Sequence, residues 1–176
     1  FKLKPTVDGL KAPTWVHEFV LRDEEGEHLS FADVKGAFEA AFVAIWTGKA
    51  ESDGFNRLVL ELGVDWREAA LVRALARYRQ QTGLDPSQAV QEAALADNPG
   101  VARLILDLFR IKFDPAIAAD LPARKEQAAA VADRITEALQ AVESLDADRV
   151  LRAIAALVGA IQRTNFYQAG EDGAAK

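Results

Sequence analysis

The pattern of hydrophobic and polar residues changes near residue 30. Residues 15–22 alternate with the two-residue period of a β-strand, and a return strand could begin at residues 28–29. From Ser30 onwards, apolar residues recur every three to four positions, the period of an amphipathic helix. The pattern predicts a mainly α fold: a helical, bundle-like domain of about six or seven helices with a short β element at its N-terminus.

Capping residues and glycines mark where the predicted helices begin and end. Ser30 suits an N-cap position, and Asp65 with Glu68 has the form of a capping box. Glycines stand where three helices should end: Gly48, Gly63 and Gly83. We therefore expect helices over residues 31–47, 53–62, 66–82, 86–96, 99–113, 122–142 and 145–165.

The apolar stripes predict which helix faces are buried. The first helix carries one such stripe, formed by Phe31, Val34, Phe38, Phe42 and Ile45. Residues 153–161 carry no charge on any side, so we expect that stretch to be buried all round. The large aromatic residues of the helices also fall on stripes and are predicted to belong to the core: Trp46, Trp66, Tyr78 and Phe109.

Composition narrows the class of protein. The chain has 176 residues, half of them hydrophobic, a net charge of −6 and no cysteine, which is typical of a folded protein in a reducing compartment. We expect a cytoplasmic location and no membrane partner. The chain starts at Phe1 and contains no methionine, which indicates a segment of a longer protein. Residues 169–176 are expected to form a flexible tail.

Motifs for catalysis were not found in the sequence. It contains no G-x-G spacing for a dinucleotide, no P-loop and no G-x-S-x-G. Its two histidines, His17 and His28, are interpreted as packed or surface side chains rather than metal ligands. We therefore predict no catalytic, cofactor-binding or metal-binding residue in this chain.

One helix is rich in arginine. Arg73 and Arg77 are one turn apart on the helix over residues 66–82, and two interpretations are open. The pair could contact nucleic acid as on a recognition helix, or form an ion-pair surface between domains. The acidic chain disfavours nucleic acid. We interpret the pair as a candidate interdomain contact.

Several strings together resemble one family, the large bacterial NAD-specific glutamate dehydrogenases. They are WVHEFVLR at 15–22, DGFNRLVLELGVDWREAALVRALARYRQQTG at 53–83, NPGVARLILDLFRIKFDP at 98–115 and LDADRVLRAIAALVGAIQRTNFYQ at 145–168. The resemblance implies that residues 1–29 are the last strands of an ACT-like α/β module. It also implies that the helical domain, residues 30–168, lies just before the catalytic domain.

The resemblance further implies a parent oxidoreductase of amino-acid catabolism, which deaminates L-glutamate to 2-oxoglutarate and ammonium and reduces NAD. No catalytic motif of the family matches a position here, so NAD is expected in the parent and no cofactor in this segment, which alone should be inactive. The expected role is a helical scaffold whose partners are the ACT-like and catalytic domains of its own chain, in a homo-oligomer. Phe166 and Tyr167 are candidate contacts to the catalytic domain. The alternative is an autonomous helical domain that binds protein or nucleic acid.

Overall fold

The computed structural model describes residues 2–3, 6–7, 10–11, 14–15, 31–83, 87–117 and 120–168. Contacts divide the chain into two units, Phe1–Ala32 and Asp33–Lys176. Two antiparallel strand pairs are described in the first unit: β1 (Lys2–Leu3) with β4 (Thr14–Trp15), and β2 (Thr6–Val7) with β3 (Leu10–Lys11). The predicted strand over 15–22, apart from Trp15, and both histidines lie outside the described residues. The ACT-like assignment stays a prediction.

The second unit is built from helices, and the prediction of a mainly α fold is confirmed. Its α-helices are α1 (Phe31–Trp46), α2 (Arg57–Leu62), α3 (Trp66–Gln81), α4 (Gln88–Ala96), α5 (Pro99–Phe113), α6 (Leu121–Ala138) and α7 (Leu145–Ala160). Short 3₁₀ turns precede α2 and follow α6: η1 (Gly54–Asn56) and η2 (Leu139–Ala141). Within the described ranges, none of the helices combines the length and the apolar character needed to cross a membrane.

Local capping explains why the helices begin where they do. Asp65 and Glu68 form the predicted capping box at the start of α3, where the Glu68 N–H donates to Asp65 Oδ1 at 2.8 Å. Asp120 caps α6 through a bond of 2.9 Å from the Ala123 N–H. Gly63 follows α2 with φ of 62°, a left-handed conformation that glycine adopts without steric cost. These ends are determined by neighbouring residues, which is why the sequence predicts them.

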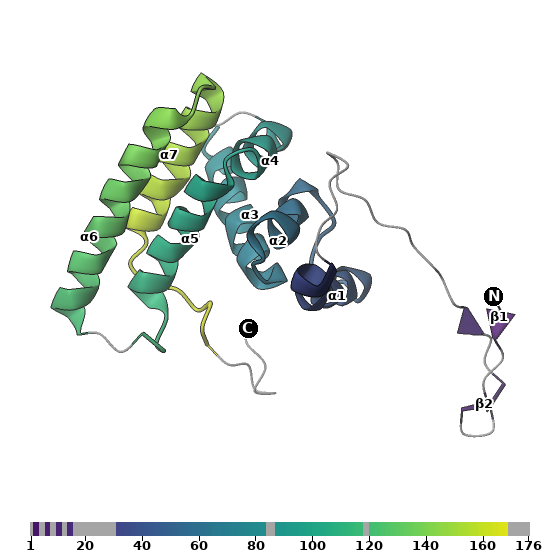
Figure 1. Cartoon of the computed structure of the whole chain (residues 1–176). Helices are drawn as coiled ribbons and strands as arrows, with labels where there is room; N and C mark the ends of the chain where they lie inside the picture. The colour runs from purple at the N-terminus through teal and green to yellow at the C-terminus, as the bar shows by residue number, and fades with distance from the viewer. Residues whose placement is uncertain are drawn as a thin grey trace. The chain divides into compact units, whose positions relative to one another are not determined.

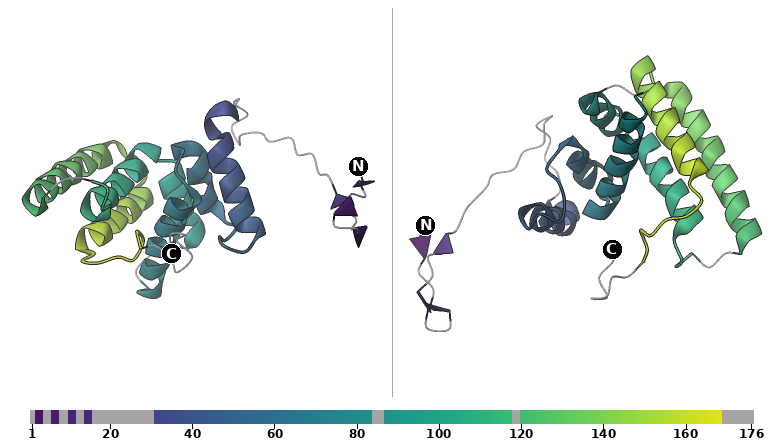
Figure 2. Two further views of the ribbon diagram at one scale, coloured as in Figure 1. Left: turned by 90° about the horizontal axis from the view of Figure 1, so that it is seen from below. Right: turned by 180° about the vertical axis from the view of Figure 1, so that it is seen from behind.

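The core runs from η1, α2 and α3 through α4 and α5 to α6 and α7. Helix α5 packs against both α6 and α7, and α4 packs against α7 (Figures 1 and 2). The largest fully buried apolar side chains are those of Phe55, Leu58, Leu95, Ile105, Leu106, Phe109, Leu151 and Ile154. They belong to one continuous cluster, so helices from both halves of this unit share one core.

Helix α7 departs from the prediction in two ways. It ends at Ala160 rather than residue 165, because Ile161 turns into an extended backbone with ψ of 129°. It is also not buried all round: Ile154 and Val158 are buried, whereas Ala156, Gly159 and Ala160 are exposed. Small uncharged residues made the stretch look like a fully buried helix, but they cost little when they face water.

The expected burial of the first helix is wrong in part. Helix α1 is attached through its alanines, since Ala41 and Ala44 are buried and Ala41 clusters with Val59 and Ala69 of α2 and α3. Phe42, which the apolar stripe placed in the core, is 44% exposed. Trp46 and Tyr78 are also exposed, at 80% and 58%. Small alanine side chains let the helix axes approach closely, and the bulkier side chains remain outside the contact.

Candidate functional site

The candidate site is centred on the segment that follows α7, residues 161–168, which we call the exit segment. It is not helical, and two local bonds shape it: the Phe166 N–H donates to Thr164 Oγ1 at 3.1 Å, and the Gln168 N–H donates to the Asn165 carbonyl at 2.9 Å. In Figure 1 it continues in yellow from the end of α7 towards α5. Two predicted contact residues, Phe166 and Tyr167, lie in it.

Phe109 of α5 holds the two aromatic residues of the exit segment. Phe109 is 1% exposed, and its ring meets Phe166 edge to face at 5.5 Å between centroids and stacks on Tyr167 at 6.2 Å. Phe166 and Tyr167 also touch each other at 5.0 Å. Such aromatic pairs contribute beyond their buried area. The structure therefore brings both predicted residues against the core of their own unit.

Arg67 of α3 also contacts the exit segment. Its Nη2 donates to the Phe166 carbonyl at 2.6 Å, and its guanidinium carbon lies 4.6 Å from the centre of the Phe166 ring, a cation–π geometry. Nearby, Arg110 forms an ion pair of 2.6 Å with Glu68, the capping residue of α3. Burial and neighbouring carboxylates raise the pKa of Tyr167 to about 12.

Lys112 of α5 caps the C-terminal end of α7. Its Nζ donates to three backbone carbonyls: those of Val158 at 2.8 Å, Gly159, and Ile161 at 3.1 Å. The last carbonyls of a helix lack donors within the helix, and a cation there also interacts favourably with the helix dipole. Partial burial lowers the pKa of the Lys112 ammonium. This contact supplies donors to carbonyls at the end of α7.

The other two predicted contact residues, Arg73 and Arg77, lie elsewhere, beside η1. Arg73 is 4% exposed, and its Nε and Nη2 donate to the two carboxylate oxygens of Asp53 at 2.6 and 2.7 Å. Arg77 forms an ion pair with Glu51 at the surface. Both guanidinium groups are held by carboxylates of the same unit, which reduces the basic surface on which the nucleic-acid alternative depended. Their proposed contact with another domain stays a prediction.

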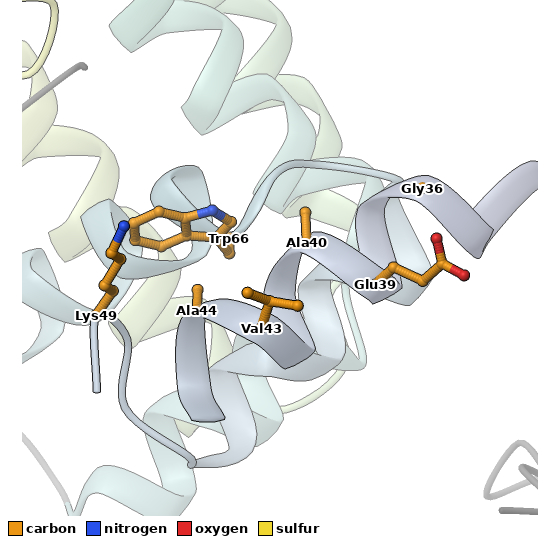
Figure 3. Close-up of a pocket in the computed structure, with 7 residues that line it drawn as sticks. All are labelled: Gly36, Glu39, Ala40, Val43, Ala44, Lys49 and Trp66. Carbon is orange, nitrogen blue, oxygen red and sulfur yellow. The ribbon is translucent and has the colours of Figure 1, made fainter. Parts of the chain in front are cut away.

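A shallow hollow lies beside α1. Figure 3 shows the Trp66 indole across from the alanines of α1, with Lys49 next to the ring. Its lining residues are Gly36, Glu39, Ala40, Val43, Ala44, Lys49 and Trp66. Small apolar side chains form most of this surface, and the one carboxylate and the one amine come from Glu39 and Lys49. The described part of the chain contains no group of three His, Cys, Asp or Glu side chains that could hold a metal.

The sequence pattern did not identify Lys112 and Phe109 as parts of this site. The only available signal was local: Lys112 stands in the last turn of α5, a usual place for a cation. Its acceptors are more than 45 residues away in the sequence. Phe109 was predicted to be buried, which is confirmed, but its aromatic partners depend on the path of the exit segment.

Comparison with protein families divides the helical unit into two matched regions. Residues 50–115 match the family model described as glutamate dehydrogenase, helical motif 3. Residues 134–176 match the family model described as bacterial NAD-glutamate dehydrogenase, catalytic domain. The first region contains α2 to α5, and the second contains α7 and the exit segment. The site described above therefore lies where the two matched regions meet.

Curated relatives support the same assignment. The chain is 36% identical over 167 residues to the NAD-specific glutamate dehydrogenase of Halomonas elongata, 38% over 165 residues to that of Mycobacterium tuberculosis and 36% over 162 residues to that of Pseudomonas aeruginosa. These matches cover 95%, 91% and 90% of the chain, which spans about 10% of the length of each relative. No solved structure matches the chain significantly. The chain thus belongs to the NAD-specific glutamate dehydrogenase family, in a part where a match to helical motif 3 is followed by a match to the catalytic domain.

Proposed function

We propose that this chain is a non-catalytic helical scaffold within an NAD-dependent glutamate dehydrogenase. The parent enzyme oxidatively deaminates L-glutamate to 2-oxoglutarate and ammonium and reduces NAD. The helical unit lies between the part of the parent before residue 30 and the rest of the catalytic domain, and its partners are other domains of the same chain in a homo-oligomer. NAD binds to the parent outside this segment.

One observation carries this proposal: the two matched regions share a single core. Helices α4 and α5 of the helical-motif region lie against α7 of the catalytic-domain region. The shared interior includes Phe109, Leu151 and Ile154, each at most 1% exposed. Well-packed interiors transmit displacements rather than absorb them. The helical motif and the matched part of the catalytic domain are therefore packed into one unit.

The proposal predicts that the isolated 176-residue chain neither binds NAD nor oxidises glutamate. The physical reason is that the sequence lacks the glycine-rich turn that brings a backbone close to a pyrophosphate. NAD binding is measured by titration calorimetry, and NADH formation by its absorbance. The full-length enzyme serves as the positive control. Saturable NAD binding, or turnover above the enzyme-free rate, would show that the segment contributes to catalysis directly.

A further inference from the structure

One type of contact between the two matched regions is a hydrogen bond from a cationic side chain to a backbone carbonyl. Arg67, Arg79 and Lys112, all in the helical-motif region, donate to backbone carbonyls of the catalytic-domain region. The acceptors are Phe166 for Arg67, Ala153 at 3.4 Å for Arg79, and Val158, Gly159 and Ile161 for Lys112. We call these three cations and their acceptors the cation–carbonyl clamp.

The clamp joins side-chain donors on one side to backbone acceptors on the other. Every acceptor is a main-chain oxygen, so side-chain changes in the catalytic-domain region leave these acceptors in place. The donors, in contrast, are individual side chains on α3 and α5, and replacing one of them removes its bonds. Single substitutions in the helical-motif region can therefore remove these bonds, whereas side-chain substitutions at the acceptor positions leave the carbonyls in place.

Lys112 is the central member of the clamp. An ammonium group has three donors, and Lys112 uses its Nζ for three carbonyls around the last turn of α7. These bonds satisfy carbonyls that the helix leaves open. Because Ile161 is extended where α7 ends, the same bonds determine where the chain leaves the helix. Arg67 then holds the chain five residues further on, at the Phe166 carbonyl.

We propose that Lys112 and Arg67 are positioning residues of the parent enzyme, which hold the exit segment and set the direction in which the chain enters the rest of the catalytic domain. This inference rests on the proposed function, because it requires the chain to continue into that domain. Neither side chain is assigned a contact with substrate or NAD. Their effect on turnover is transmitted through the orientation of the exit segment.

The test uses the full-length enzyme with Lys112→Met, which keeps the length of the side chain and removes its donors. Hydrogen exchange read by mass spectrometry follows residues 161–168, and steady-state kinetics give kcat and KM for both substrates. Losing bonds from a charged donor should accelerate exchange in this segment by about tenfold or more. The kcat should fall severalfold with little change in either KM, because the binding sites stay intact while their placement becomes variable.

Two further variants separate positioning from a general loss of stability. Lys125→Met removes an exposed lysine on α6 and should match the wild-type enzyme in exchange and kcat. Lys112→Arg keeps a cationic donor at the end of α7 and should restore most of both properties. If Lys112→Met does not fold, Arg67→Gln, which shortens the donor to Phe166, is measured in the same way.

If amide hydrogen exchange in residues 161–168 is unchanged in Lys112→Met, the clamp does not hold the exit segment. Faster exchange with an unchanged kcat would show that the segment does not position the catalytic domain. Either result overturns the inference and leaves the proposed scaffold role standing, because that role is tested by NAD binding to the isolated chain. Faster exchange together with a lower kcat, reversed by Lys112→Arg, supports the inference.

Discussion

At the scale of single residues, Arg73 illustrates how a charge can serve structure instead of recognition. Its guanidinium binds both oxygens of Asp53 and donates to Asn56 Oδ1 at 2.9 Å. Asp53 in turn accepts from the Phe55 N–H at 3.2 Å and caps η1. The pair therefore fixes the turn before α2 against α3. The two side chains are only 5% and 11% exposed, so this ion pair is nearly buried within its own unit.

We predict that Arg73→Met lowers the free energy of unfolding of the chain by about 3–5 kcal/mol, because Asp53 would keep a buried charge without its partner. Arg77→Met is the matched control, since its pair with Glu51 has side chains that are 41% and 56% exposed, and exposed pairs contribute little. Urea unfolding followed by circular dichroism measures both. Equal losses in the two variants would contradict the assigned role of burial.

The residue scale also shows what a sequence can and cannot predict. The capping box of Asp65 and Glu68 was predicted because its partners are three residues apart. The partner of Arg73 was not predicted, because Asp53 lies 20 residues away and competes with many other carboxylates. Local hydrogen bonds can be derived from spacing, whereas tertiary ion pairs require the path of the chain.

At the scale of elements, the starts of most helices could be predicted and the buried faces only in part. Helix α5 begins at Pro99 and ends at Phe113, as expected from the prolines around it. Helix α1 has the predicted length, yet it buries alanines and exposes Phe42, because the choice of face depends on how closely α2 and α3 approach. The end of α7 was missed because Lys112, which caps it, belongs to another helix.

Helix α7 allows a direct test of which apolar positions stabilise the unit. We predict that Ile154→Ala lowers the free energy of unfolding by about 2–5 kcal/mol, because Ile154 is 0% exposed and the change leaves a cavity. Leu145→Ala on the same helix is the control: Leu145 is 87% exposed, and the change should stay within about 0.5 kcal/mol. Thermal and urea unfolding measure both variants. A similar cost at the two positions would contradict the assigned core.

At the scale of the whole molecule, the two family matches and the fold describe the chain differently. The matches separate residues 50–115 from residues 134–176, whereas the buried cluster runs through both regions without a break. The two matched regions are therefore separate along the sequence, but their side chains pack into the same core.

The aromatic residues of the exit segment provide the test at this scale. We predict that replacing both Phe166 and Tyr167 by alanine in the full-length enzyme lowers glutamate-dependent NADH formation, because Phe109 then loses the two rings that fix the exit segment. The melting temperature should fall only modestly, since Phe166 and Tyr167 are half-buried and the cluster around Leu151 and Ile154 is untouched. Oligomer size is measured by sedimentation in the same samples, so that loss of assembly is recognised.

Phe42→Ala is the control, because it removes an aromatic ring from the exposed side of α1, far along the chain from the exit segment. If the double variant and the control both match the wild-type enzyme in turnover, melting and size, the aromatic contact only completes the core of its own unit and does not place the catalytic domain.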